Sequence, residues 1–422
     1  MYTFKMDVKK DELAYSEVII GDCVYDLKRF AKHHPGGATM LNIFGGNDAT
    51  VHYHMLHGHK NIRVDALEPF KIRNKSQPFQ HQYLLNSAIF QDLKQRVSKA
   101  IPNPYATSEW YIKAIVIMVC NLFLELHSIV YGFTYVKSAF LGMTMALIGL
   151  CIQHDANHGA VSRKPWVNVL WGYTQDWIGG SSLLWKHHHV LMHHAYTNTI
   201  NADPDVTTSA IRVHNTIEKR NYHYFQTIYT WFLFMLLPLS WHFKEIYDMV
   251  AMKHCGSNIS KMARGESNIG IFLRCLFLIR FYVIPLYLYP SLHTILCILV
   301  CLSIGGLYLG INFIISHNFE GTLCSLSFDN VSDKKKDWAI EQINTSSTVG
   351  GRILGFFHGG LNYQIEHHLF PRISHVHYHI VQRIVMEWCN EHGIKYNYYN
   401  NLYENLKSCI YHLNSMGKGF EM

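Results

Sequence analysis

Histidine is unusually frequent in this sequence, with 29 copies in 422 residues. Several of them fall in three short clusters far apart along the chain: His154–His158 (HDANH), His189–His194 (HVLMHH) and Gln364–His368 (QIEHH). Side chains four residues apart share one face of a helix, so the first cluster aligns His154 with His158, and the second aligns His189 with His193. Neutral imidazole is a ligand for iron, zinc and copper. The spacing therefore indicates metal binding.

The clusters together offer more ligands than one metal ion can use. One iron or zinc ion takes about four to six ligands. The predicted catalytic and metal-binding set has seven imidazoles and one amide: His154, His158, His189, His193, His194, His367, His368 and Gln364. This number favours two metal ions. The alternative is that these histidines are incidental members of polar helix faces.

A separate histidine motif near the N-terminus predicts a haem site. His34-Pro35-Gly36-Gly37 would form a tight turn without bulky side chains, which lets His34 approach a haem iron closely. His57 would bind the opposite face. A haem with two axial imidazoles transfers electrons and binds no oxygen. Nearby histidines that compete for the second position are His52, His54 and His59, whereas His33 is predicted to be a bystander. An ordinary turn in a small globular domain is the alternative.

Composition indicates a membrane protein. Apolar residues make up 49% of the chain and charged residues 16%, against roughly 25% charged residues in soluble domains. A membrane-spanning helix needs about 20 apolar residues, and four runs qualify, at about 110–133, 135–153, 271–289 and 293–316. A fifth run, 224–241, is interrupted by Pro238, and we assign it to the membrane interface. Glu125 and Arg280 lie inside two of the spans.

Charge and cysteine usage indicate how the chain is oriented. Lys and Arg are abundant in the N-terminal region, in 155–268 and in the C-terminal tail, so these segments are expected in the cytosol, with both termini. The net charge of +7 includes no separate basic block, which argues against nucleic-acid binding. The cysteines form no CxxC pair, and several lie in apolar runs, as in a reducing compartment.

We therefore predict an α+β haem domain followed by an all-α domain. The expected boundaries are 1–75 for the small haem-binding domain, 76–105 for a linker with an interfacial amphipathic helix, and 106–422 for a four-transmembrane-helix domain with a cytosolic helical cap. Four crossings keep both termini on one side. An electron-transferring haem beside the histidine clusters favours iron as the metal in the clusters.

These motifs resemble two known families. Residues 8–70 resemble cytochrome b5, through the HPGG turn and the Tyr53–His57 stretch. The chain from about residue 86 onward resembles the membrane fatty acid desaturases. The segment Gly360–Pro371 (GLNYQIEHHLFP), in which Gln364 replaces a histidine, is typical of their front-end branch. That resemblance implies a further metal ligand at His317, near the end of the last span.

The resemblance also implies an activity. Front-end desaturases insert a cis double bond between an existing double bond and the carboxyl end of a polyunsaturated acyl chain, carried as acyl-CoA or phospholipid. The implied cofactors are haem b and two non-haem irons, with O2 as co-substrate and NADH acting through a cytochrome b5 reductase. The implied location is the endoplasmic reticulum membrane. The motifs lean toward Δ5 and Δ4 enzymes, while a sphingolipid Δ8 desaturase, a hydroxylase and a non-catalytic haem electron carrier remain alternatives.

Residues around the clusters carry secondary expectations. Ligating histidines need an acceptor for their second ring nitrogen. The carboxylates expected to supply it are Asp155, Asp203, Asp205 and Glu366. His187 and His188 fall outside the second cluster. The alternating histidines after the third cluster are expected at the surface: His375, His377 and His379.

Overall fold

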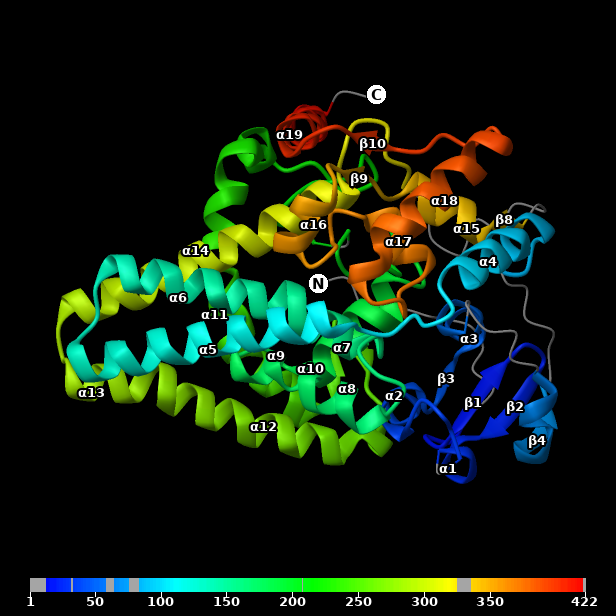
Figure 1. Ribbon diagram of the computed structural model, residues 1–422, viewed down its shortest axis with the longest axis horizontal. Helices are drawn as coiled ribbons and strands as arrows, with labels where there is room; N and C mark the ends of the chain where they lie inside the picture. Colours follow the sequence, from blue (N-terminus) through cyan, green and yellow to red (C-terminus); the bar gives the residue numbers. More distant parts are fainter. Residues whose placement is uncertain are drawn as a thin grey trace.

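The computed structural model describes residues 13–31, 33–57, 64–75, 83–206, 208–324 and 335–419. A small domain containing a β-sheet lies at one end of a long helical bundle, and a cap of shorter helices covers the same end (Figure 1). His59 and part of the predicted linker, 76–82, lie outside the described residues.

The described N-terminal residues form a mixed four-stranded sheet in the order β3-β1-β2-β4. The strands are β1 (Glu17–Ile20), β2 (Cys23–Asp26), β3 (Asn47–Asp48) and β4 (Lys71–Asn74). Strands β1 and β2 are antiparallel with Ile20 opposite Cys23, and Gly21 takes the positive φ that the two-residue turn requires. Helices pack around the sheet: α1 (Leu27–Phe30), α2 (Ala38–Phe44) and α3 (Thr50–Leu56). The predicted α+β class is confirmed.

Within the described residues, four helical stretches are long and apolar enough to cross a membrane. They cover Ser108–Tyr131, Tyr135–Asn157, Lys261–Leu288 and Leu292–His317. The first is α5 and the last is α14; the second contains α6 (Tyr135–Ile148) and α7 (His154–Asn157), and the third contains α12 (Arg264–Leu278) and α13 (Ile284–Leu288). The third starts ten residues before the predicted apolar run because polar residues form its first turns.

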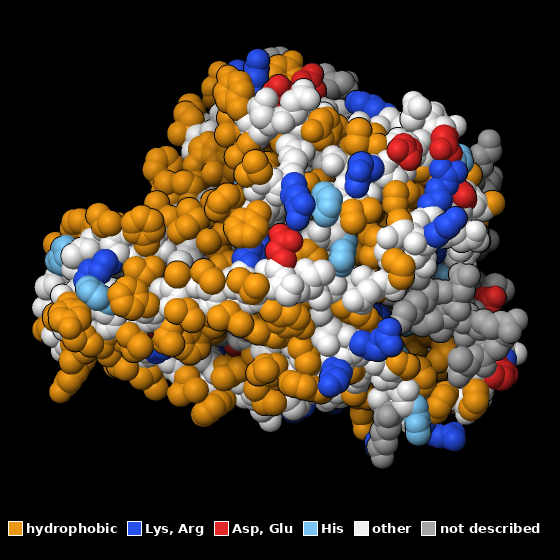
Figure 2. Space-filling view, in the orientation of Figure 1, with side chains coloured by type: hydrophobic (Ala, Val, Ile, Leu, Met, Phe, Trp, Pro, Cys, Tyr) orange, Lys and Arg blue, Asp and Glu red, His pale blue; other side chains and the backbone are white. Residues whose placement is uncertain are grey.

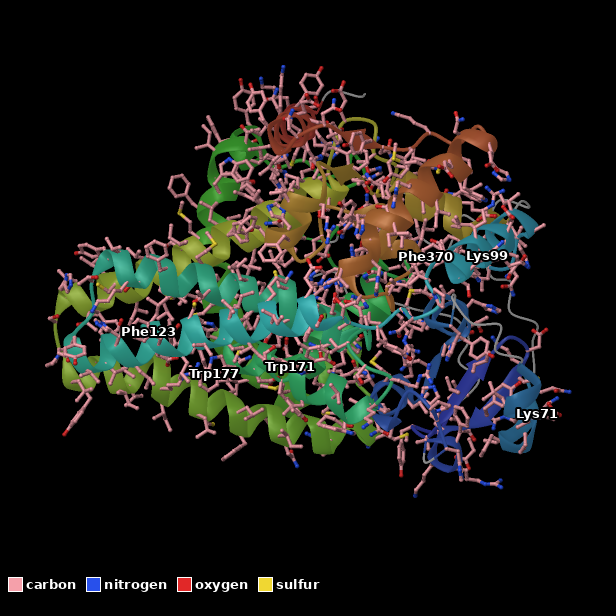
Figure 3. All side chains as sticks on the ribbon, viewed as in Figure 1. Lys71, Lys99, Phe123, Trp171, Trp177 and Phe370 are labelled. Atoms are coloured by element: carbon pink, nitrogen blue, oxygen red, sulfur yellow. The ribbon has the colours of Figure 1, made fainter. Side chains whose placement is uncertain are left out.

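The surface of this bundle is apolar. Figure 2 shows hydrophobic side chains along the sides of the projecting part of the bundle, whereas most charged side chains in this view lie toward the opposite end. Phe123, Val130 and Phe272 are each more than 60% exposed. Phe123 lies along the bundle in Figure 3, far from Lys71 and Lys99. Exposed apolar surface of this extent is what lipid contact requires.

Helix α11 (Gln226–Ala251) corrects one expectation about the fifth apolar run. The predicted interruption at Pro238 is wrong, because the helix continues through it for 26 residues. Pro238 packs against α14 at Gly306, where a Cβ atom would lie 2.7 Å from Pro238 Cδ. A glycine on the neighbouring helix therefore makes room for the proline ring, and packing outweighs the hydrogen bond that proline removes.

Glu125 and Arg280, the charged residues deep in the bundle, form an ion pair. Arg280 Nε lies 2.6 Å from Glu125 Oε1, and the guanidinium stacks 3.4 Å above the Trp177 ring. Charged residues at membrane depth usually pair inside the protein in this way.

A cap of shorter elements closes the end of the bundle that faces the small domain. Its core includes Phe90, Trp338 and Trp388, all buried. Its helices are α4 (Ala88–Ala100), α15 (Trp338–Asn344), α16 (Arg352–His358), α17 (Gln364–Leu369), α18 (Tyr378–Glu391) and α19 (Leu402–Lys418). Further short helices follow the second span: α8 (Pro165–Gly172), α9 (Thr174–Trp177) and α10 (Ser182–Trp185).

Candidate metal centre

The three histidine clusters meet between the bundle and the cap. The first cluster lies on α7 at the end of the second span, the second on a π-helical segment, Lys186–His193, and the third on α17. His154 and His158 have ring centroids 4.8 Å apart, and His367 lies 4.5 and 4.8 Å from them. Segments more than 200 residues apart in sequence thus converge on one buried space.

The π-helix changes the pairing that α-helical spacing predicts for the second cluster. The His194 backbone N–H donates to the His189 carbonyl at 3.0 Å, so residues five apart become neighbours. The Nε2 atoms of His189 and His194 are 3.1 Å apart. His189 and His193 still lie side by side, with their rings stacked 5.2 Å apart, although their ring nitrogens fall in different metal-sized groups.

Two groups of histidines have the size of a metal site. His154, His158, His189 and His367 offer ring nitrogens that lie within 4.8 Å of one another, and so do His193, His317 and His368. His194 lies between the groups, with its ring 4.5 Å from His367 and stacked 4.2 Å from His368. Every cluster contributes to the shared space, and the third cluster gives one histidine to each group.

Gln364 belongs to the second group. Its Nε2 lies 2.9 Å from His317 Nε2 and 3.4 Å from His368 Nε2, while its Oε1 is buried without a hydrogen-bond partner among the described residues. Rotation of the amide by half a turn would present Oε1, an acceptor, to the same space.

Most ring nitrogens on the outer side of the centre have partners. The Nδ1 atoms of His193, His317 and His367 lie 3.0 Å from Asp203 Oδ2, the Thr345 carbonyl and the Tyr378 hydroxyl, respectively. His368 Nδ1 lies 2.9 Å from Gln342 Oε1. These contacts leave the Nε2 atoms directed inward, the arrangement that orients metal-ligating histidines.

Several inward nitrogens are buried with no partner among the described residues: His154 Nε2, both ring nitrogens of His158, and His367 Nε2. Leaving such atoms unsatisfied is costly in a folded protein. Metal ions bound by these nitrogens would remove that cost. The donor set, imidazoles with one amide, suits iron or zinc and fits two ions.

The pKa values of these rings favour the ligating form. Burial lowers the pKa of His158, His189, His194, His367 and His368 well below the ordinary value, and neighbouring imidazoles lower it further. His193 differs: burial, the largest single influence, lowers its pKa, but the nearby carboxylates of Asp203 and Asp205 together raise it more, so the net shift is upward. The low values favour neutral imidazole, which is the state that binds metals.

Two of the four carboxylates predicted to support the ligands do not reach a cluster histidine. Asp203 and Asp205 both lie near His193 Nδ1, at 3.0 and 3.2 Å. Asp155 instead accepts hydrogen bonds from the Ser374 hydroxyl and the His375 ring. Glu366 accepts from the hydroxyls of Tyr396 and Thr348. Asp155 and Glu366 therefore stabilise the packing of the cap around the centre.

His375 is not at the surface as expected. It is 5% exposed and lies between Asp155 and Lys113, whose Nζ is 2.6 Å from His375 Nε2. His377 and His379 are half-buried. The residues that sequence reasoning missed, Gln342, Thr345, Tyr378 and His375, carry no local motif, because only packing brings them to the centre.

The local geometry around His34 and His57 fits the predicted haem site. His34 Nδ1 donates to the Gly37 carbonyl and His57 Nδ1 to the Tyr53 carbonyl, each at 2.8 Å, which leaves both Nε2 atoms free to bind iron. Their ring centroids are 6.2 Å apart. Two imidazoles on opposite sides of one metal, each bound at about 2 Å, have centroids about 6 Å apart. The pair therefore fits bis-imidazole haem, and a Cβ on Gly36 would lie 2.7 Å from the His34 ring.

The haem domain contacts the segment that carries the second cluster. His52 of α3 is buried, and its Nε2 donates to the Leu191 carbonyl at 2.6 Å. Asn42 Nδ2 donates to Glu266 Oε1 at 2.9 Å. His52 thus fixes the domain interface, and its pKa is lowered to about 4, mainly by burial.

Comparisons with known proteins identify both regions. Residues 132–400 match the family model described as fatty acid desaturase. The chain belongs to the fatty acid desaturase family. Residues 8–90 match the model for a cytochrome b5-like heme/steroid binding domain, so this desaturase is a cytochrome b5-fused, front-end member and an oxidoreductase.

Relatives cover nearly the whole desaturase. An acyl-lipid (7-3)-desaturase of Rebecca salina is 37% identical over 95% of this chain and 90% of its own length. A protein of the same description from Diacronema lutheri is 36% identical over 94% of this chain and 90% of its own length. A probable Delta(5) fatty acid desaturase C of Dictyostelium discoideum is 28% identical over 95% of this chain and 91% of its own length. The predicted fusion and family are confirmed.

Proposed function

We propose that this desaturase inserts a cis double bond near the carboxyl end of a polyunsaturated, lipid-linked acyl chain, with the (7-3) specificity named for the relatives from Rebecca salina and Diacronema lutheri. The observation that supports this proposal is the convergence of the three clusters and His317 into two adjacent groups of histidines, all of them buried except the half-buried His189. A non-catalytic electron carrier would have no use for this arrangement.

Each residue of the centre has a proposed part. His154, His158, His189 and His367 hold one iron ion, His193, His317 and His368 hold the other, and His194 lies where it reaches both. Gln364 fills a position beside the second group. When bound, the iron pair supplies the redox chemistry that uses O2 to remove hydrogens from two adjacent CH2 groups. The protein orients the ligands through Asp203, Thr345, Tyr378 and Gln342 and keeps water away by burial.

The fused haem domain is proposed to deliver the electrons. His34 and His57 would hold the haem, and the contact of His52 with Leu191 keeps the domain against the segment that carries the second cluster. A separate cytochrome b5 reductase that uses NADH is the proposed donor to the haem. The proposed location is the endoplasmic reticulum membrane with both termini in the cytosol; four spans and the contact between the haem domain and the cytosolic segment support this orientation.

Expression in a host fed defined polyunsaturated fatty acids tests this proposal. We expect a new double bond on the carboxyl side of the existing ones, found by mass spectrometry in membrane lipids before it appears in acyl-CoA. Products of a Δ5 or Δ6 reaction would contradict the (7-3) specificity. If the main product is a desaturated sphingolipid base or a hydroxylated acyl chain, the proposed desaturation of acyl lipids is wrong.

The variant His193→Ala tests the metal centre in the same host. Because His193 belongs to the second group, we expect product to fall to background and non-haem iron to be lost, while haem absorbance remains. His33→Ala, at an exposed position, is the matched control and should keep full activity. Undiminished product from His193→Ala would refute the assignment.

A further inference from the structure

A third group of possible metal ligands lies beside the second cluster and outside the centre described above. The ligand atoms of His188, His254 and Cys255 lie within 4.8 Å of one another. Cys255 Sγ is 3.3 Å from His188 Nδ1. All three residues are half-buried, so an ion could reach them from solvent.

The outer ring nitrogens of this group are held by carboxylates. His188 Nε2 lies 2.7 Å from Asp205 Oδ1, and His254 Nδ1 lies 2.8 Å from Asp248 Oδ2. Each histidine therefore has one nitrogen fixed by a carboxylate and the other available to the group. Carboxylate–histidine–metal arrangements of this kind fix the tautomer and increase the basicity of the ligating nitrogen.

The backbone places the thiol at an unusual position. Strands β6 (Lys253–His254) and β7 (Ser257–Asn258) form a hairpin whose two-residue turn is Cys255-Gly256, with φ of 48° and 78°. Such turns prefer asparagine, aspartate or glycine at the first position because a side chain there is strained. The turn accepts a cysteine here despite the strain, and its thiol lies beside His188.

We propose that His188, His254 and Cys255 bind a zinc ion with water in the fourth position. Zinc prefers tetrahedral sites of imidazole and thiolate ligands, and a half-buried site of three protein ligands leaves room for water. The ion ties the β6–β7 hairpin to the π-helical segment of the second cluster. Asp205 links the two metal sites, since its other oxygen lies 3.2 Å from His193 Nδ1.

Metal analysis of the full-length desaturase, purified in detergent with its haem and iron, tests the proposal. We expect about one zinc ion per haem in addition to the non-haem iron. Cys255→Ala and His254→Gln should each reduce zinc to background while the ratio of non-haem iron to haem is retained. Cys23→Ala is the matched control, because Cys23 is a half-buried thiol of the haem domain, next to Asn74; it should retain the zinc.

A second measurement avoids any folding defect of the variants. In the wild-type protein, a maleimide should label Cys255 slowly before treatment with a zinc chelator and rapidly after it, while labelling of Cys23 stays the same. Cobalt bound in place of zinc should give a thiolate charge-transfer absorption that Cys255→Ala abolishes. Background zinc in the wild type, zinc retained in Cys255→Ala, or labelling of Cys255 that ignores the chelator would each overturn the proposal in favour of a metal-free thiol–imidazole contact.

Discussion

The two histidine sites of this desaturase are held in different ways. In the haem domain, Nδ1 of each histidine donates to a carbonyl of its own segment, three residues away for His34 and four for His57. At the metal centre the partners are distant: Asp203 is 10 residues from His193, Tyr378 is 11 from His367, and Thr345 is 28 from His317. The haem site thus depends on local turns, whereas the metal centre depends on the packing of the whole bundle and cap.

The haem site and the metal centre also differ in how deeply their histidines are buried. His34 and His57 are half-buried, while His154, His158, His194, His367 and His368 are buried. Buried polar nitrogens without partners are costly, so the metal centre relies on bound ions and precise acceptors more than the haem site does. The two sites should therefore respond independently to substitution.

The largest effect is expected when a haem ligand is removed, and it should be confined to the haem site. His34→Ala should abolish the haem absorbance because one axial ligand is removed. Non-haem iron should remain bound, because the contacts of the metal centre do not pass through His34. Absorption spectroscopy and iron analysis of the purified protein measure both quantities. His33→Ala is the control, and loss of non-haem iron in His34→Ala would show that the sites are not independent.

An intermediate effect is expected for the acceptor of His193. Asp203→Asn removes the charge that orients the ring, and loss of such a partner costs roughly 10- to 100-fold in metal affinity or activity. Product formation and iron content should fall while haem absorbance stays unchanged. Asp92→Asn, at an exposed carboxylate paired with Arg96, is the control. Wild-type activity in Asp203→Asn would mean that this distant contact does not hold the ligand.

The smallest expected effect concerns His367. Tyr378→Phe removes the hydroxyl near Nδ1 and leaves a buried nitrogen unsatisfied, at a cost of about 1–3 kcal/mol. At the low end of this range, that cost corresponds to roughly a fivefold fall in activity. Initial rates of product formation measure it. Tyr399→Phe removes a hydroxyl that bonds Ser408 instead, and it should leave the rate unchanged; equal losses in both variants would indicate a general packing defect.

Prediction from the sequence succeeded where a feature is local. The HPGG motif, the histidine clusters and the four apolar runs gave the haem domain, the fusion and the membrane-length helices. The boundaries at 75 and 105 and the role of each site residue stay predictions. The π-helix at Lys186–His193 was missed because α-helical spacing was assumed, and continuation of α11 through Pro238 depends on Gly306 of another helix.

The amino-acid sequence by itself determined which residue types can bind metal and haem, the four apolar runs of membrane length, and the turn that carries His34. Only the tertiary structure decided that His317 lies beside His193 and His368, that His375 is buried against Asp155, and that Cys255 lies beside His188. The physical reason is that such contacts join segments tens to hundreds of residues apart, and their geometry is set by packing and by the burial of polar atoms.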